Sequence, residues 1–279
     1  MNADRIATLD TFTERCDALL GSDPVLHTQV CSIAAIAGRQ PDRFRDAAWF
    51  VVADGGVAVG AAAQSPPFEL AITPMPARAL AALVGTVAKD APEVPGVSGP
   101  RPAVDAFAEL WRERTGGPVT EHRAMRLFRL DEVSAPTGVS GELRSVADLT
   151  SFKELFVQWV CDFVRELDGE DAHEPEELID RSIARRGLWV WCDGGAPVGF
   201  ANMSVPAYGV TRVGLVYTPP ELRGRGYASA CVAEMSRRAR ADQLVPVLFT
   251  DQANATTNRI YQRIGYRPVA DAAEYAFAG

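Results

Sequence analysis

The 279-residue chain has few of the residues that commonly bind metals, form disulfides or cross membranes. Its three histidines stand alone, and its five cysteines are scattered with no Cys-x-x-Cys pair, so no spacing typical of a metal site is present. An odd, scattered set of cysteines predicts reduced thiols rather than a disulfide framework. The longest apolar run, residues 47–63, is broken by an Asp-Gly-Gly turn and therefore cannot span a bilayer. We expect neither a metal site nor a membrane span.

Positive charge is also scarce. The 28 Lys and Arg residues are outnumbered by 36 Asp and Glu residues, which gives a formal net charge of −8. This balance argues against an extended nucleic-acid-binding surface, although a local basic site remains possible, and it mildly favours a cationic small-molecule partner. The first residues, Met1 to Arg5, lead into a charged segment rather than a signal peptide, so we expect a cytoplasmic protein.

The most informative stretch runs from Val213 to Ser229. Its apolar start predicts a buried strand, two prolines then predict a stiff turn, and a glycine-arginine loop begins a helix. The first turn of a helix has free N–H donors and the positive end of the helix dipole. Gly224 and Gly226 lack the Cβ that would keep a ligand away from the backbone. The stretch therefore predicts a site for a phosphorylated cofactor just beyond a strand.

A faint internal repeat relates the two halves of the chain. Residues 49–60 and 188–199 each read as a strand, an Asp-Gly-Gly turn and a second strand. Further on, each half has a strand that ends in Thr-Pro, at residues 70–74 and 215–219, followed by an alanine-rich helix. The order of four elements agrees, so we predict a structural duplication. The first copy lacks the glycine-arginine loop.

The pattern of the second half predicts alternating strands and helices. Apolar residues at helical spacing predict one helix over 146–167, and the chain ends in a strand from Tyr266 with a possible further strand over 273–277. We predict an α/β fold with a central mixed, mostly antiparallel sheet flanked by helices. It is divided into two tandem domains, residues 1–135 and 140–279, joined by a small, turn-forming linker.

Two motifs carry a resemblance to a known family. The loop from Arg223 to Ala228 reads Arg-Gly-Arg-Gly-Tyr-Ala, and about thirty residues later an asparagine-led helix has Asn254, Tyr261 and a closing Gly-Tyr pair. Both motifs, at this spacing, resemble the GNAT superfamily of acetyl-coenzyme A-dependent acyltransferases, whose signature loop is Arg/Gln-x-x-Gly-x-Gly/Ala. The resemblance covers residues 140–279, and the first half is similar to a degenerate copy, as in a tandem GNAT protein.

The resemblance implies acetyl-CoA as co-substrate, transfer of the acetyl group to a primary amine by direct attack, and no metal. Tyr261 matches the general acid at the sulfur, and the backbone N–H of Val216 or Tyr217 matches the oxyanion donor. The residues implied in holding the cofactor are Val216, Tyr217, Thr218, Arg223, Gly224, Arg225, Gly226, Tyr227, Ala228, Ser229, Asn254 and Tyr261. Each has a plainer reading, such as surface arginine, helix cap or core tyrosine.

The acceptor is left open by the sequence. Trp159, Asp162 and Glu166 lie on the aromatic helix where acceptors of the family often bind, and solvated charge or core packing is the plainer reading for them. The partner is expected to be a small-molecule or peptide amine. The first half, with Arg112 or Trp111 where Tyr261 has its counterpart, is expected to brace the second half without catalysing.

Two other functions fit parts of the sequence. A non-catalytic acyl-CoA-binding or sensing module needs the loop but not the tyrosine. A dinucleotide-binding enzyme is indicated by Gly224 and Gly226 between a strand and a helix, with Asp251 at the end of the next strand. Against the dinucleotide reading, Ser229 stands in place of the third glycine, and six residues separate the strand from the first glycine.

Overall fold

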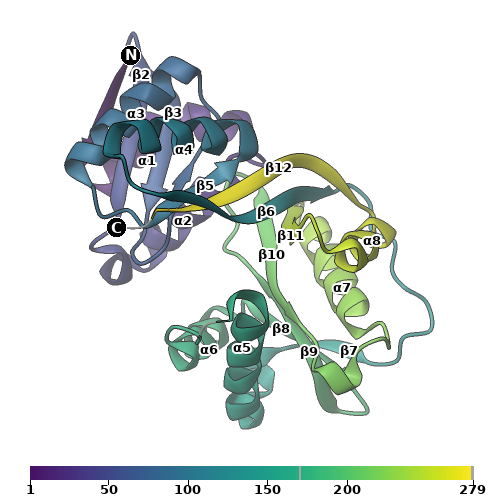
Figure 1. Ribbon diagram of the computed structural model, residues 1–279. Coiled ribbons are helices and arrows are strands. Elements are labelled where there is room, and N and C mark those ends of the chain that lie inside the picture. Colours follow the sequence, from purple (N-terminus) through teal and green to yellow (C-terminus); the bar gives the residue numbers. More distant parts are fainter. Residues whose placement is uncertain (170, 278–279) are drawn as a thin grey trace.

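One continuous sheet forms the centre of the molecule (Figure 1). The computed structural model describes residues 1–169 and 171–277; Ala278 and Gly279, where the second predicted domain ends, lie outside the described residues. Over the described ranges the sheet has 12 strands in the order β1-β2-β3-β4-β5-β12-β6-β11-β10-β9-β8-β7. This mixed α/β architecture confirms the predicted fold class.

The first half contains six strands and four α-helices among the described residues. Its elements are β1 (Asn2–Ile6), α1 (Leu9–Ser22), α2 (Thr28–Arg39), the 3₁₀ helix η1 (Pro41–Phe44), β2 (Ala48–Asp54), β3 (Val57–Gln64), β4 (Leu70–Ile72), α3 (Ala77–Asp90), β5 (Gly96–Pro100), α4 (Arg101–Thr115) and β6 (Val119–Leu130).

The second half repeats this order of elements. Its elements are β7 (Glu142–Ser145), η2 (Val146–Asp148), η3 (Thr150–Phe152), α5 (Lys153–Asp168), α6 (Pro175–Arg185), β8 (Leu188–Asp193), β9 (Ala196–Met203), β10 (Val210–Tyr217), η4 (Pro220–Leu222), α7 (Tyr227–Ala241), β11 (Val245–Asp251), α8 (Ala255–Ile264) and β12 (Tyr266–Phe277).

Strand pairing repeats along with the element order. In each half the first four strands are antiparallel neighbours and the fourth pairs in parallel with the fifth, as β4 with β5 and β10 with β11. Even an irregularity recurs: the first hairpin shifts register between Val52 and Ala53, and the second between Trp191 and Cys192. These are the same positions of the predicted repeat, so a bulge that twists a hairpin is present in both copies.

The two halves exchange their last strands. β6, from the first half, pairs with β11 of the second, and β12, from the second half, pairs with β5 of the first. The two long strands also pair with each other, and ion pairs join Arg126 to Asp271 (2.7 Å) and Arg123 to Glu274 (3.0 Å). In Figure 1, β12 (yellow) crosses from α8 into the first half. The halves are therefore joined by a shared centre of sheet.

The helices cover two faces of the sheet. α5 and α6 pack on one face of the second half, and α7 and α8 on the other (Figure 1). In the first half, α1 and α2 cover one face and α3 and α4 the other. The α1–α2 connection reaches the second half, where Val25 packs with Val210 and Val247. We call the face covered by α1, α2, α5 and α6 the first face, and the opposite one the second face.

Two local predictions were wrong. The single helix predicted over 146–167 is instead two 3₁₀ turns followed by α5, because the Ser145 side chain caps a short turn and Leu149 has non-helical φ and ψ of −130° and 33°. The two strands predicted at the C-terminal end are one long strand, β12, with register shifts between Pro268 and Ala270 and between Glu274 and Tyr275.

Candidate active site

Strands β10 and β11 separate partway along their length. They pair in parallel from Val210 to Val213, whereas β11 continues against β6 as far as Asp251. Beyond Val213, β10 has a bulge, and Leu215 takes a positive φ of 48°. A positive φ is uncommon for a branched side chain and is typical of functional sites. The result is a gap between two parallel strands, edged by the backbone of residues 214–217.

The bulge also sorts the side chains around the gap. Leu215 and Tyr217 pack with the α5 and α6 cluster on the first face, whereas Val216 packs against the α7 and α8 cluster on the second face. The gap therefore connects the two faces of the sheet. A narrow ligand in this gap would contact the main chain of Val216 on the edge of β10 that is not paired with β11.

The glycine-arginine loop follows directly. Gly224 and Gly226 take left-handed φ values of 79° and 83°, and Gly226 caps the N-terminus of α7. Across the described chain, no group accepts a hydrogen bond from the backbone N–H of any residue from 224 to 229. A Cβ on Gly224 would meet no atom within 4 Å, so open space lies beside the loop. Six free donors at a helix N-terminus form a cradle for an anion such as a phosphate.

Arg223 stabilises the turn before this cradle. Its Nε donates to the Thr218 carbonyl at 2.8 Å, and its Nη2 lies 2.7 and 2.8 Å from the two carboxylate oxygens of Glu166. The guanidinium carbon lies 5.8 Å from the Tyr217 ring centroid. Arg223 therefore joins the loop to α5, and its charge is already shared with Glu166.

The far side of the loop is attached to the second Asp-Gly-Gly hairpin. The Tyr227 hydroxyl donates to Asp193 at 2.6 Å, and this hydrogen bond lowers the pKa of the Asp193 carboxyl. Arg225 lies 3.5 Å from the Glu221 carbonyl, and its charge also acts on Tyr227 and Asp193. Arg225 is thus the less restrained of the two loop arginines.

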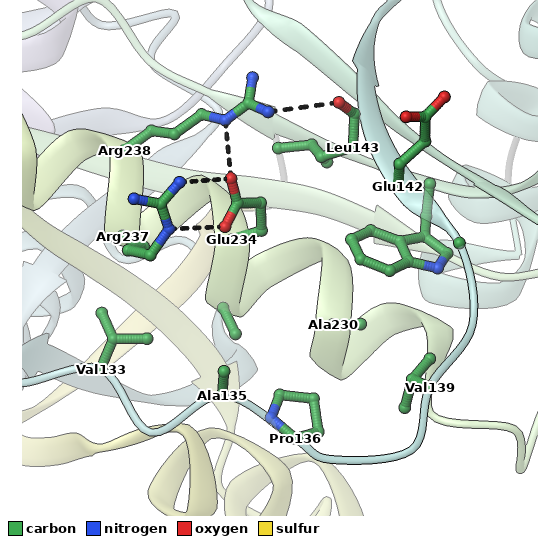
Figure 2. A pocket seen from close by; sticks show the side chains of 13 residues that line it. Val133, Ala135, Pro136, Val139, Glu142, Leu143, Ala230, Glu234, Arg237 and Arg238 are labelled. Carbon is green, nitrogen blue, oxygen red and sulfur yellow. Dashed lines mark hydrogen bonds and ion pairs between the residues drawn. The ribbon is translucent and has the colours of Figure 1, made fainter.

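A groove of about 360 Å³ lies beside the loop on the second face (Figure 2). It separates the inter-domain linker from α7, and Glu234 inside it pairs with both Arg237 (2.7 Å) and Arg238 (3.0 Å). The linker residue Val139 lies so close to Gly226 that an added Cβ there would be 2.9 Å from its Cγ2. None of the predicted site residues lines this groove.

Tyr261 lies in the second-face core with its ring 7% exposed. It packs edge-on to Tyr266 at 5.9 Å, in the cluster that Val216 contacts. Its hydroxyl has no hydrogen-bond partner among the described residues. The hydroxyl oxygen is not fully enclosed, so part of its surface stays accessible. Burial raises the pKa of Tyr261, so the hydroxyl stays protonated and can donate a hydrogen bond.

Asn254 caps α8 through its side-chain oxygen, which accepts from the Thr257 N–H at 3.0 Å. Its side-chain nitrogen has no partner among the residues described. Sequence reasoning missed Asn258, whose amide nitrogen donates to the Asp251 carbonyl (3.1 Å) and whose oxygen accepts from Thr250. Asn258 ties the end of β11 to α8; its place four residues after the cap, facing the strand end, was the available signal.

The candidate acceptor residues are not equivalent. Trp159 is core, 5% exposed, with its ring 5.7 Å from Phe200 and 6.2 Å from Tyr217. Asp162 accepts from Gln158 at 2.8 Å, and Glu166 holds Arg223. The structure therefore brings Trp159 and Glu166 together around Tyr217 and Arg223. Asp162 is paired along its own helix, and it also lies near enough that its charge, after burial, helps to raise the pKa of Tyr217.

Thr218, at the end of β10, has a buried hydroxyl without a hydrogen-bond partner. A Cβ on Gly199 would lie 2.9 Å from this oxygen, so glycine is required for the close approach of β9 to the turn. A buried unpaired hydroxyl is costly.

The corresponding place in the first half is closed. Leu70 and Ala71 of β4 pair with Val97 and Ser98 of β5, and a Cβ on Gly99 would lie 2.6 Å from the Ile72 carbonyl. The next helix, α3, begins directly after Pro76, without a glycine loop. On α4, Trp111 stacks on Phe277 at 4.9 Å. No gap and no cradle are present in this half of the described chain.

Comparison with known proteins shows what the second half is similar to. Residues 153–266, which contain the strand gap and the glycine loop, match the acetyltransferase (GNAT) family model. No curated protein matches the sequence significantly.

Solved structures extend the likeness to the whole chain. An acetyltransferase of the GNAT family from Colwellia psychrerythraea is similar with a TM-score of 0.60 and 12% identity, covering 100% of both chains. A Drosophila protein matches with a TM-score of 0.70 and 11% identity over 99% of this chain and 98% of its own. A tandem GNAT protein from the clavulanic acid biosynthesis pathway matches at 0.55 and 15%, over 99% and 98%. The chain thus has the fold of a tandem GNAT protein.

The helices of the described residues include none with the length and apolarity needed to cross a membrane. Nor do the described residues contain a group of three or more His, Cys, Asp or Glu side chains placed to hold a metal ion.

Proposed function

We propose that the protein is an N-acetyltransferase that transfers an acetyl group from acetyl-CoA to a primary amine, and that residues 140–279 carry the activity. The observation that carries the proposal is the strand gap of β10 and β11 leading straight to six free backbone donors, residues 224–229. The gap suits a thin chain that adds to a strand edge, and the cradle suits a diphosphate. Residues 1–135 form a supporting domain in this proposal.

The proposed binding roles follow from contacts around the gap. Main-chain groups of residues 216–218 border it on the β10 side. The amides from Gly224 to Ser229 would hold the phosphates, with Arg225 adding charge, and the Asn254 side-chain nitrogen offers one more donor. Arg223 positions this loop from behind, through Thr218 and Glu166.

The chemistry needs an acyl donor activated for attack, and a thioester supplies a carbonyl with a good leaving group. The chain's own part is to orient and to stabilise charge. A backbone N–H at Val216 or Tyr217, held rigid by the bulge, would stabilise the developing oxyanion. Tyr261 would donate to the departing sulfur. A tyrosine at its ordinary pKa of about 10 gives its proton to a thiolate of about 8.5 only at a cost of about 2 kcal/mol.

Burial widens that difference, because it raises the pKa of Tyr261 further. Tyr261 therefore acts as a hydrogen-bond donor at the sulfur more than as a full proton donor. The amine must arrive neutral. Asp162 and Glu166 are paired with other side chains, which makes water the simplest proton acceptor.

The test separates enzyme from sensor. The full-length protein is titrated with coenzyme A by calorimetry, and thiol release from acetyl-CoA is then measured with a panel of amines. We expect binding with one site per chain and amine-dependent release. Binding without release by any amine would favour an acyl-CoA sensor, and absence of binding would overturn the proposal. NADH in the same titration tests the dinucleotide alternative.

A further inference from the structure

Basic side chains gather on the first face of the sheet, where η1 of the first half lies near α6 of the second. Three arginines, Arg43 on η1 and Arg181 and Arg185 on α6, lie near enough for their charges to act on one another. Arg181 is paired with Glu177 at 2.7 Å. Arg43 and Arg185 have no ion pair in the described part of the chain, and burial, together with repulsion from Arg181, lowers the pKa of both.

Arg185 reaches the sheet itself. Its Nη2 donates to the Asn202 side chain on β9 at 3.3 Å, and its Nε is enclosed without a hydrogen-bond acceptor. Asn202 lies opposite Gly214, the residue at which β10 begins to leave β11. Arg185 therefore places an unsatisfied donor beside the start of the gap, and an enclosed donor of a charged group is costly when unpaired.

Arg212 lies two residues before Gly214 on the same face. Its backbone pairs with Ser204, two residues beyond Asn202. Within the described residues its guanidinium has no hydrogen bond or ion pair, although protein surrounds it, and some of its surface stays accessible. The carboxylate that acts on it is Glu274, which is already paired with Arg123 at 3.0 Å. A partly buried cation that has no ion pair among the described residues is costly, so its position favours binding of an anion from outside the protein.

We propose that Arg212, with Arg185 as a second basic group, binds an anionic group of the acceptor, so that the acyl acceptor is an amine that also carries a carboxylate or a phosphate. This inference rests on the proposed function. It places the acceptor on the first face of the sheet, and it names the chemical class of that acceptor. The local charge thus opposes the mild preference for a cationic acceptor that the net charge of −8 gave.

The strand sets the distance between the two ends of such a substrate. Val216 lies four residues beyond Arg212, which is about 13 Å along an extended strand. The bulge shortens this path, and the long arginine side chain reaches toward the gap. The amine and the anionic group must therefore be separated by several bonds, as in an ω-amino acid or a phosphorylated amine.

Binding of the anion can be measured without knowing the acceptor. The protein is first saturated with coenzyme A, which fills the loop cradle, and is then titrated by calorimetry with inorganic phosphate at constant ionic strength. We expect saturable binding that is weakened at least about tenfold in Arg212→Gln. The control is Arg78→Gln, an exposed arginine on α3 on the opposite face, which should bind phosphate as the native protein does.

A second measurement uses turnover. The ω-amino carboxylates of increasing chain length are compared with their carboxamides, which have the same shape but no charge. We expect the carboxylates to have the higher kcat/KM at one preferred length, and Arg212→Gln to remove most of that difference while leaving the amides unchanged. Thermal unfolding checks folding, and since Arg212 is unpaired, its loss should leave the Tm equal or higher.

The outcomes are distinguishable. If coenzyme A does not bind, the proposed function fails. If coenzyme A binds and phosphate binds equally to Arg212→Gln and the native protein, or not at all, the anionic subsite is wrong and the proposed function stands. Equal turnover of acids and amides by an active enzyme would likewise overturn the subsite. A large fall in Tm for Arg212→Gln would show a structural role instead.

Discussion

The two halves of this molecule share a fold and differ at one place. Both have the same strand order, the same parallel pair and even the same hairpin bulge. In the first half the parallel strands stay paired through Leu70 and Ala71, whereas in the second half the counterpart residues Leu215 and Val216 lie beyond the last pair. A binding gap thus arises from losing two pairs of a ladder, without a change of architecture.

The same difference extends to the turn that follows. After β4, Pro76 leads directly into α3, so no glycine loop exists to present free amides. After β10, a short 3₁₀ turn and two left-handed glycines precede α7. Where the first half has lost the gap, aromatic packing has taken over: Trp111, Phe107 and Phe277 form a stack. The first half is closed at this place, and only the second half of the described chain has both the gap and the free amides.

The largest effect is expected from a substitution that destabilises the first half, in which the gap is closed. Trp111→Ala removes a side chain that is 5% exposed and stacked on Phe277, so the free energy of unfolding should fall by about 3–5 kcal/mol. Chemical denaturation measures the loss. Under conditions where the variant is folded, its affinity for coenzyme A should be unchanged, since the cradle is in the other half. A matching loss of affinity per folded molecule would show that the first half takes part in binding.

Next in size is a substitution that closes the open half. Gly226→Val demands a left-handed φ of 83° from a branched residue and places a Cβ 2.9 Å from Val139. We expect affinity for coenzyme A to fall by about a hundredfold or more, measured by calorimetry, because the loop must rearrange.

The control for this change is a glycine of the first half. Gly85 in α3 has open space around it and no left-handed φ. Gly85→Ala should stabilise the protein by up to about 1 kcal/mol and leave binding alone. Native affinity in Gly226→Val would remove the loop from the site.

Tyr261→Phe tests the chemical step within the open half. We expect kcat to fall about ten- to a thousandfold without being abolished, because a thiolate can also leave unaided. Steady-state kinetics at saturating substrates measure the change. Tyr266→Phe is the matched control: its hydroxyl bonds Ser236 at 2.8 Å in the core, so its loss should cost about 1 kcal/mol of stability and leave kcat unaffected. An unchanged kcat in Tyr261→Phe would exclude Tyr261 from catalysis.

A smaller effect is expected behind the loop. Glu166→Gln removes the carboxylate that holds Arg223, in a pair about half exposed, so coenzyme A affinity should change only about two- to fivefold. The comparison variant is Asp148→Asn, which breaks a similarly exposed pair with Arg186 away from the loop and should not alter affinity. A loss of binding beyond about tenfold would mean that Arg223 carries more than a bracing role.

The smallest expected effect is on the pH profile. Burial raises the pKa of Tyr261, so in the folded protein its hydroxyl keeps its proton beyond the pH at which a tyrosine ordinarily ionises. The hydroxyl is therefore protonated throughout the neutral and moderately alkaline range, and kcat should show no fall assignable to Tyr261 up to about pH 10. A decline with a midpoint near pH 8 that disappears in Tyr261→Phe would contradict this.

Much of the fold followed from local sequence signals. The Asp-Gly-Gly turns specify hairpins because two consecutive glycines accept positive φ, and the structure has both hairpins. The helix after Gly226 and the cap at Asn254 also follow from local chemistry. The region 146–152 was mispredicted, because apolar spacing alone does not show that Ser145 caps a separate short turn.

For the candidate site, the sequence indicated the loop but misjudged some side chains. Arg223 stood out as a positive charge beside a phosphate cradle, and only the position of Glu166, 57 residues away, shows that this charge is shared. Arg212 gave no local signal, since its importance lies in what strands and helices bring next to it. The only signal for Asn258 was its place four residues after the cap of α8.

The sequence by itself determined the elements, the duplication and the glycine loop, because turns, caps and apolar periodicity act over a few residues. Tertiary structure alone decided three things: the exchange of β6 and β12 between the halves, the opening of β10 from β11, and the partial burial of Arg212 with no ion pair among the described residues. Each depends on which distant segments pack together, and contacts between distant segments are set by the whole sheet rather than by any stretch of the chain.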